Sequence, residues 1–320
     1  ILTFAVMLFC SFTSPGDVVD LSKFGTANCY IVSKTGRYKF RVSKGNSKAS
    51  VGPVSNVAVL WESFGTDVEP SVGALIERVA FKDGYIAFQT ADDFQEGNAV
   101  IAAKNASGKI LWSWHVWFTD QPQEQVYYNN AGTMMDRNLG ATSATPNAEG
   151  SLGLMYQWGR KDPFMGPAQS SGIMAQATGS WSYGYSNSKM WHDTNPMTFD
   201  GSSGSYANGW DSEKTIWDPC PSGWKIPDGS DNGIWATAAG SAFSNGHATQ
   251  NFSGIFGDDE VIWYPKAGRI SFNVFYDVLT SGYYWSSSDY NILYKYSFII
   301  NSSSAAISNS NGASVRCCKE

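Results

Sequence analysis

The stretch WDPCPSGWKIP, from Trp217 to Pro227, decides how the second half of this chain folds. Its three prolines and its glycine hold the backbone on a turn-rich path. Trp217 and Trp224 supply large side chains that cover this path. We interpret the stretch as a structural staple anchored by Cys220. Long Gly/Ser/Asn loops and scattered tryptophans surround it, and DNGIWATAAGSAF, residues 231–243, is the main segment with a helical period.

The first part of the chain has a different pattern, in which short strand-like runs alternate with turns. From Asp17 to Asp120, several runs alternate apolar and polar residues, and they recur at the spacing of a strand plus a turn. The runs are NCYIVS, GRYKFRV, NVAVLWE, GALIERVAF, GYIAFQT, NAVIAAK and ILWSWHVWF. This pattern predicts two sheets packed around one core, as in a β-sandwich.

The polar segment TDQPQEQ, from Thr119 to Gln125, separates the two patterns. We therefore expect a β-sandwich domain at residues 15–122 and a second domain at residues 123–320. Residues 1–14 begin with the apolar run ILTFAVMLFCSF and have no initiator Met, which indicates the hydrophobic part of a truncated secretory signal. The alternative for this run is a buried strand of a preceding domain.

Charge and composition narrow the classes of partner. The chain has 22 basic and 28 acidic residues, a formal charge of -6, and no run of Lys or Arg that could follow a phosphate backbone, so we expect no nucleic acid partner. Aromatic residues make up 15% of the chain and charged residues only 16%, which favours a turn-rich extracellular β protein. We expect a secreted protein of the cell surface or outer membrane that meets the membrane only through an anchor.

The cysteines indicate a disulfide and no metal site. None of them falls in a CxxC pair or a Cys/His cluster, so the sequence predicts no metal and no cofactor. An exported protein is expected to form disulfides. We pair Cys220 with Cys317, regard Cys318 as the competing partner, and expect Cys29 to be a buried free thiol.

Five motifs in the second part occur together in one known family. They are MDRNLGAT at Met135, GLMYQWGRKDPF at Gly153, WDPCPSGWKIP at Trp217, YYWSSS at Tyr283 and SVRCCKE at Ser314. Together they resemble the Fibrobacter succinogenes major paralogous domain, which is common in secreted and surface proteins of gut Bacteroidetes and has a C-type-lectin-like fold. The resemblance covers residues 127–320.

The first part is similar to the β-sandwich that precedes this module in fimbrial, adhesin-like Bacteroides proteins, through TANCYIVS, AVLWES and GNAVIAAKNASGKILWSWHVWFTD. The two resemblances imply a mostly β protein. Its immunoglobulin-like β-sandwich would be followed by a C-type-lectin-like α+β module with long loops.

The stretch DYNILYKYSF, from Asp289 to Phe298, offers aromatic contact area without catalytic groups. Alternation within ILYKYSFII predicts a strand with Tyr294, Tyr296 and Phe298 on one face, and Lys295 with its alternate neighbours on the other. Tyr combined with Ser and Asn is the mixture that binding loops favour. We predict that the ligand-contacting surface includes Asp289, Tyr290, Asn291, Ile292, Tyr294, Tyr296, Ser308 and Ser310. Tyr296 is the first of these that we expect to be core instead.

Residues 286–311 also resemble the variable region of a diversity-generating retroelement target. Every residue there except Lys295 can be encoded by a codon that ends in a pyrimidine, which adenine-directed mutagenesis of Asn codons would leave behind. The alternative is an ordinary Asn/Ser-rich member of the family.

These observations favour an adhesin or fimbrial tip-like protein, and not an enzyme. Its partner would be a protein or glycan ligand on a host or bacterial surface, and a fimbrial stalk subunit is a second expected partner. The alternatives are an enzyme on the related fold of formylglycine-generating enzymes and a structural fimbrial subunit. His115, His192 and His247 are scattered, and no Ser or Cys has a recognisable nucleophile context.

Two charged motifs have a binding and a structural interpretation. In QWGRKDPF, Arg160 and Asp162 could bind a ligand, but a buried ion pair that orders the loop is favoured. The acidic run GDDE, residues 257–260, could supply oxygen ligands to Ca²⁺. A solvated turn is favoured there, because the run lacks the alternating Asp/Asn pattern of a dedicated calcium loop.

Overall fold

The computed structural model describes residues 17–167, 181–185, 189–202, 209–239, 243–244, 247–248, 262–291, 293–300 and 306–320. The protein is mostly β, with 39% strand and 7% helix. Two short 3₁₀ helices span Tyr128–Asn130 and Glu149–Ser151. The described α-helices are α1, Lys189–Thr194, and α2, Ile234–Ala239, and the latter lies inside the segment with predicted helical period. Neither has the length and hydropathy needed to cross a membrane. The predicted signal segment, residues 1–14, lies outside the described residues.

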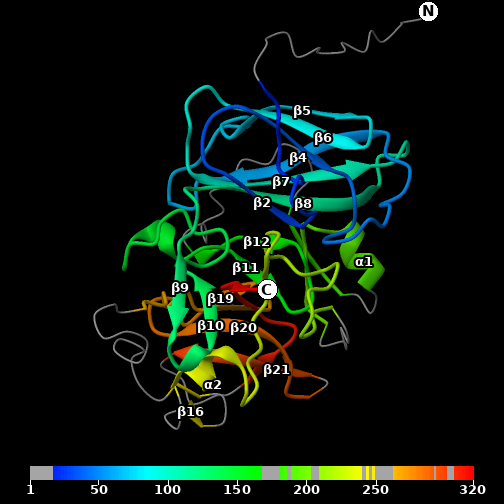
Figure 1. Cartoon of the computed structure of the whole chain (residues 1–320). Coiled ribbons are helices and arrows are strands. Elements are labelled where there is room, and N and C mark those ends of the chain that lie inside the picture. The colour runs from blue at the N-terminus through cyan, green and yellow to red at the C-terminus, as the bar shows by residue number, and fades with distance from the viewer. Residues whose placement is uncertain are drawn as a thin grey trace, which may run out of the picture.

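Two four-stranded sheets in the first part of the chain pack face to face (Figure 1). In spatial order, the first sheet consists of β1 (Val19–Asp20), β3 (Arg37–Arg41), β6 (Tyr85–Thr90) and β5 (Ile76–Lys82). The second consists of β2 (Cys29–Val32), β8 (Ile110–Phe118), β7 (Gly97–Lys104) and β4 (Asn56–Ser63). In β3, Tyr38 and Phe40 point into the core between the sheets while their neighbours face outward, as strand periodicity requires.

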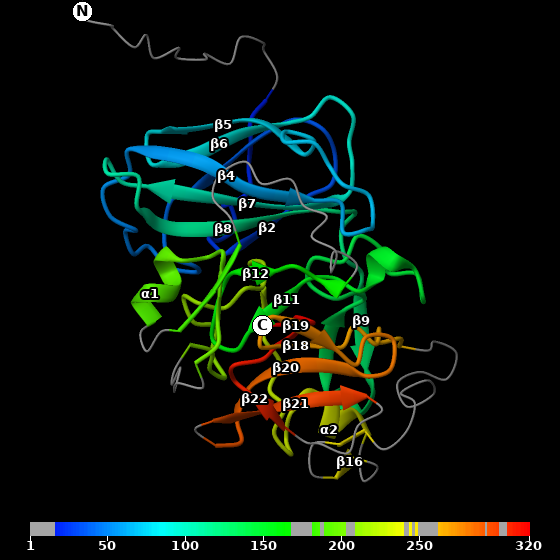
Figure 2. The same ribbon diagram turned by 180° about the vertical axis from the view of Figure 1, so that it is seen from behind.

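The second sheet is buried on both faces. In β8, Trp112, Trp114, Val116 and Phe118 pack into the core between the two sheets, whereas Trp117 packs into a core shared with the second part of the chain. Figures 1 and 2 show this sheet between the first sheet and the strands of residues 124–320. The two parts therefore share a hydrophobic core, although the polar segment TDQPQEQ separates them in the sequence.

The second part contains one large mixed sheet. Its main path runs through β12 (Pro163–Phe164), β11 (Met155–Gln157), β23 (Gly312–Ser314), β20 (Gly282–Asp289), β21 (Tyr294–Ile300), β17 (His247–Ala248) and β16 (Phe243–Ser244). Beside this path lie β18 (Arg269–Ser271), β19 (Val274–Tyr276) and β22 (Ala306–Ser308).

Two smaller sheets complete the second part. One consists of β15 (Trp224–Lys225), β24 (Cys318–Lys319), β10 (Gly132–Met135) and β9 (Glu124–Tyr127). The other pairs β13 (Ser182–Gly184) with β14 (Thr198–Asp200) in parallel. Against the large sheet, Trp235 of α2 stacks on Phe298 of β21 with ring centroids 5.1 Å apart.

The stretch WDPCPSGWKIP is held by a disulfide and by a buried ion pair. Cys220 and Cys317 form a disulfide with Cα atoms 6.0 Å apart, which ties the turn to the end of the chain. Asp218 accepts hydrogen bonds from the backbone N–H groups of Cys220 and Ile226, at 2.8 and 2.9 Å. Lys214 donates to the Asp218 carboxylate at 2.7 Å. The sequence did not indicate this contribution of Lys214 and Asp218. Cys29 and Cys318 are buried free thiols.

Candidate binding surface

The predicted ligand-contacting stretch forms the tip of the hairpin between β20 and β21. At this tip, Tyr290 is 55% exposed, Tyr294 46% and Leu293 41%. Asp289 and Asn291 are also exposed. Ile292 lies outside the described residues, and Tyr296 belongs to β21 but its side chain lies outside the description. We call the surface formed by Asp289, Tyr290, Asn291, Leu293 and Tyr294 the hairpin tip.

Asn291 builds the turn of the hairpin tip. Its Oδ1 accepts hydrogen bonds from the backbone N–H groups of Leu293 and Tyr294, both at 2.9 Å. The N–H of Asn291 donates to the carbonyl of Tyr294 at 3.0 Å. Such local side-chain bonds to the backbone are what makes Asn a turn residue. The Oδ1 atom of Asn291 is therefore used within the protein, although the residue is exposed.

Lys295 anchors the hairpin tip to the core. Its side chain is 2% exposed, and its Nζ lies 4.1 Å from the ring centroid of Trp158. The same Nζ donates to Asp289 Oδ1 at 2.5 Å. An ammonium over an indole face is a favourable position for a buried lysine. Asp289, one of the predicted contact residues, thus also holds the end of β20 in place.

Alternation required one face of β21 to be core, and among its described side chains beyond Lys295 members of both faces are buried. Phe298 belongs to the core with Tyr264 and Trp235, while Ile299 belongs to the core that the two parts share. Ser297 is buried as well. Among the described aromatic side chains of β21, the exposed one is therefore Tyr294, at the start of the strand.

Ser308 and Ser310 lie beside the hairpin tip and are half-buried. In the sheet, Ser308 of β22 is the register partner of Tyr294 in β21. The two serine hydroxyls lie 2.9 Å apart and form a hydrogen bond. The structure thus brings Ser308 next to Tyr294.

A polar cleft of about 350 Å³ opens at the base of the hairpin tip. Its lining residues are Trp158, Trp210, Asp211, Ser212, Asp228, Ser287, Ser288 and Asp289. Burial alone would raise the pKa of Asp228, but hydrogen bonds from Ser288 and Ser230 outweigh burial and hold that pKa below its ordinary value. Asp228 therefore remains a carboxylate and hydrogen-bond acceptor at neutral pH.

Sequence reasoning missed the cleft, because its walls come from distant segments. Trp158 was noticed only within QWGRKDPF, and Trp210, Asp211 and Asp228 were not singled out. The indoles of Trp158 and Trp210 lie with ring centroids 5.9 Å apart. The only available signal was the serine-rich end of YYWSSS beside Asp289.

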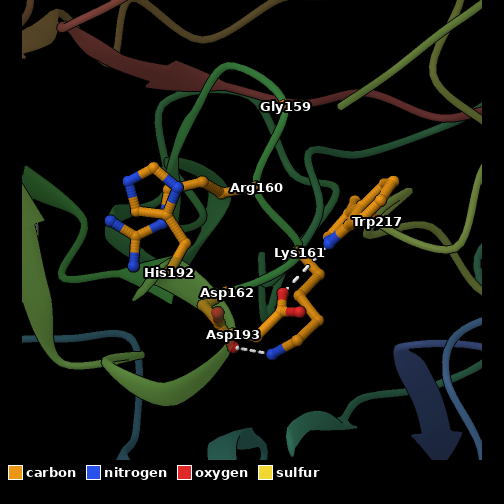
Figure 3. Close-up of a pocket in the computed structure, with 7 residues that line it drawn as sticks. All are labelled: Gly159, Arg160, Lys161, Asp162, His192, Asp193 and Trp217. Atoms are coloured by element: carbon orange, nitrogen blue, oxygen red, sulfur yellow. Dashed lines mark hydrogen bonds and ion pairs between the residues drawn. The ribbon is translucent and has the colours of Figure 1, made fainter. Parts of the chain in front are cut away.

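The QWGRKDPF loop forms a compact buried network (Figure 3). Lys161 donates to Asp162 and to Ser113 of β8, both at 2.6 Å. Arg160 donates instead to Gln157 Oε1 and to the carbonyls of Thr198 and Asn195. Burial lowers the pKa of Lys161, and Asp162 opposes this effect. The buried pair is thus Lys161 with Asp162, and it connects the loop to the sandwich.

The space within this network is small. A cavity of about 10 Å³ is lined by Gly159, Arg160, Lys161, Asp162, His192, Asp193 and Trp217, which is room for about one water molecule. The indole of Trp217 donates to Asp193 at 3.0 Å. Ion pairing within the loop therefore describes it better than the ligand-pair interpretation of Arg160 and Asp162.

The described histidines belong to separate hydrogen-bond networks. His192 lies 2.8 Å from Asp200 Oδ2, and burial together with the positive charge of Arg160 lowers its pKa to about 4 despite that carboxylate. His115 of β8 lies 2.9 Å from Asn98 Oδ1 and 3.3 Å from the hydroxyl of Tyr156. Burial lowers the pKa of His115 to about 3. His247 lies in β17, and its side chain is outside the described residues.

Among the described residues, no group of three or more His, Cys, Asp or Glu side chains is placed to hold a metal ion. The acidic run at 257–260 lies outside them. No family model, no curated protein and no solved structure matches the chain. The functional conclusion therefore depends on the geometry of the hairpin tip and the cleft.

Proposed function

We propose that the protein is a secreted cell-surface adhesin, or a fimbrial tip-like component, that binds a protein or glycan ligand through the hairpin tip and the adjacent cleft. One observation carries this proposal. Exposed Tyr290, Leu293 and Tyr294 stand on a turn fixed by Asn291 and a base fixed by Lys295, next to a cleft of about 350 Å³.

The fixed base favours binding because the hairpin tip loses little conformational entropy when a ligand binds. A tyrosine has few side-chain torsions and offers a large contact area, so its immobilisation costs little entropy. Preorganisation of the backbone by Asn291 and Lys295 reduces the ordering cost further. The cleft supplies carboxylate and hydroxyl acceptors from Asp228, Asp289 and the serines of β20 for polar groups of the ligand.

For the architecture we infer an immunoglobulin-like sandwich followed by a C-type-lectin-like module. Two face-to-face sheets in the first part support the former. A mixed sheet with long connections, closed by a disulfide between Cys220 and Cys317, supports the latter. In such an arrangement the first domain presents the ligand-binding module away from its anchor.

We also propose that the hairpin tip is diversified. Within residues 286–311, Lys295 is the one residue that no pyrimidine-ending codon encodes, and it is the buried anchor of the tip. Tyr290 and Tyr294 are exposed and can change without disturbing the core. In the same locus of related strains, we expect substitutions at Tyr290 and Tyr294 while Lys295 stays unchanged. Substitutions spread evenly over 286–311, Lys295 included, would argue against diversification.

The function is tested by adhesion of the whole chain, coupled to beads, to immobilised mucin and to cultured epithelial cells. We expect saturable adhesion that the double substitution Tyr290→Ala and Tyr294→Ala weakens by more than tenfold, since loss of an aromatic hot spot costs about 2 kcal/mol or more. Tyr276→Ala is the matched control, because Tyr276 is 43% exposed on another hairpin. Adhesion that persists in the double variant, or an equal loss in the control, would refute the hairpin tip as the binding surface.

A further inference from the structure

A second large groove lies on the sandwich, and its lining differs from that of the cleft. The groove has a volume of about 820 Å³, which is within the range of small-ligand sites. It is lined by three cationic side chains, Lys23, Arg41 and Lys48, among Ser, Thr, Asn and Gly residues and Val42, and its lining includes no Asp or Glu. We call it the basic groove. Its positive charge contrasts with the formal charge of -6 on the whole chain.

The sequence of β3 explains how cations reach the rim of the groove. In RYKFR, Tyr38 and Phe40 are buried, so Lys39 and Arg41 share the outward face of the strand. Both cations lie over the ring of Tyr85, at 4.7 Å for Lys39 and 5.0 Å for Arg41. Stacking on one aromatic ring holds two positive charges on the outer face of the sheet, and Arg41 is the one of the two that lines the groove.

The cations of the groove form no ion pair within the described part of the chain. No carboxylate there forms an ion pair with Lys23, Arg41 or Lys48. Other cations of the protein do have such partners, as Lys214 has Asp218 and Lys295 has Asp289. The carboxylate of Asp20 lies next to the lining, where it accepts hydrogen bonds from the backbone N–H and the hydroxyl of Ser22. Three cations without an ion pair still outnumber this one carboxylate, and such an excess around a concave site attracts anions.

A further polar group in the wall of the groove has no partner. Ser43 is 7% exposed, and its Oγ makes no hydrogen bond in the described structure. The Oγ atom itself is closed off from solvent, so it lies behind the surface of the groove and is not one of the groups that a ligand there would contact. The neighbouring Asn46 donates its Nδ2 to the carbonyl of Lys214 at 2.8 Å, which fixes the position of its amide in the lining.

We propose that the basic groove binds a short acidic oligosaccharide that carries carboxylate or sulfate groups. Its cations match those anions, and its hydroxyl and amide groups match sugar hydroxyls. The lining has no aromatic residue on which nucleobases could stack, which disfavours single-stranded nucleic acid. The groove is separate from the hairpin tip, so this site stands whether or not the tip binds a ligand.

Titration calorimetry on the whole chain tests the proposal with four probes. They are a sulfated heparin-derived tetrasaccharide, a tetragalacturonate that carries carboxylates alone, neutral cellotetraose and a single-stranded oligonucleotide. We expect the first two to bind. The one of these two oligosaccharides that binds more tightly shows whether the groove prefers sulfate or carboxylate groups. Cellotetraose and the oligonucleotide should bind at least tenfold more weakly. Equal binding of cellotetraose, or of the oligonucleotide, would overturn the proposal.

Variants assign the binding to the groove. Lys23→Glu combined with Lys48→Glu should weaken binding of the acidic tetrasaccharide by more than tenfold. Lys109→Glu with Lys104→Glu changes the charge equally on the same sandwich, outside the lining, and should change binding less than threefold. Tyr290→Ala should leave this binding unchanged. Retained binding in the Lys23/Lys48 variant, or an equal loss in the Lys104/Lys109 variant, would refute the groove as the site.

Discussion

The ammonium of Lys295 lies 4.1 Å from the ring centroid of Trp158 and donates at 2.5 Å to Asp289 Oδ1. The lysine side chain is 2% exposed while the Asp289 side chain is 62% exposed. One residue therefore connects the surface of the hairpin tip to the tryptophan at the base of the cleft. The geometry of the tip depends on this buried cation.

Replacement of Lys295 should destabilise the second part of the protein. We expect Lys295→Ala to lower the free energy of unfolding by about 2 kcal/mol, because both the cation–π contact and the packing of the buried stem are lost. Lys295→Met keeps most of the packing and should lose less. The measurement is urea-induced unfolding followed by tryptophan fluorescence. The exposed Lys109 is the control, and a Lys295→Ala curve identical to that of Lys109→Ala would contradict the anchoring role.

Asn291 should behave as a structural residue although it is exposed. Asn291→Ala removes the acceptor of two backbone N–H groups, and we expect a loss of about 1–2 kcal/mol. Asn291→Asp keeps the acceptor and should lose less than half of that. Tyr290→Ala, in the same turn, should stay within about 0.5 kcal/mol. Chemical denaturation of the three variants measures the order of their free energies of unfolding. Equal stability of Asn291→Ala and Tyr290→Ala would show that the turn does not depend on the amide.

The prediction for Asn291 shows where sequence reasoning reached its limit. Asn is typical both of binding loops and of turns, so the letter alone did not separate a contact residue from a turn residue. Lys295 was placed on a strand face by alternation, but its burial could not be foreseen, because a lysine is rarely buried without partners. Its partners, Trp158 and Asp289, come from separate segments.

The strands of the sandwich could be predicted from the sequence, but the contact of the sandwich with the second part could not. Alternation in GRYKFRV and GYIAFQT is typical of strands with one buried face, and Tyr38 and Phe88 lie in the core between the sheets. The run ILWSWHVWF indicated a strand, but a nearly continuous apolar run does not say what covers each face. Ser113 and His115, polar residues inside that run, were the available signal: both make hydrogen bonds to the second part.

His115 should make the stability of the protein depend on pH. The side-chain amide of Asn98 donates to the carbonyl of Gly140 at 2.9 Å, so its oxygen accepts from Nε2–H of His115 and Nδ1 is left to accept from Tyr156. This assignment requires the neutral imidazole. Burial lowers its pKa in the folded state from 6.5 to about 3. Below pH 6.5 the unfolded chain takes up a proton that the folded chain does not bind.

The free energy of unfolding should therefore fall as pH decreases from 6.5 toward 3, and the contribution of His115 is fully present above pH 6.5. The slope for one such group is at most about 1.4 kcal/mol per pH unit. His115→Gln lacks the titrating group, so its stability should decline less steeply over this window, even if it is lower at neutral pH. Urea unfolding at a series of pH values measures both slopes. Since other titrating groups are common to both proteins, parallel slopes would show that His115 is not the cause.

The disulfide between Cys220 and Cys317 should contribute a large share of the stability of the second part. It joins residues separated by 97 positions, and cross-linking a loop of this length is expected to stabilise by about 4–5 kcal/mol through the reduced entropy of the unfolded chain. It also fixes the end of the chain beside β10, where the backbone N–H of Met135 donates to the carbonyl of Cys317 at 3.0 Å.

The double substitution Cys220→Ser and Cys317→Ser should therefore lower the melting temperature strongly, and reduction of the wild-type protein should do the same. Cys318→Ser, which removes a neighbouring buried thiol but keeps the disulfide, is the control and should change stability by about 1 kcal/mol. Scanning calorimetry with and without reductant compares the double variant, the control and the wild-type protein. If the double variant melted at the same temperature as the control, the buried Lys214–Asp218 pair and the packing of Trp217 and Trp224 would be sufficient to hold the turn without the covalent bond.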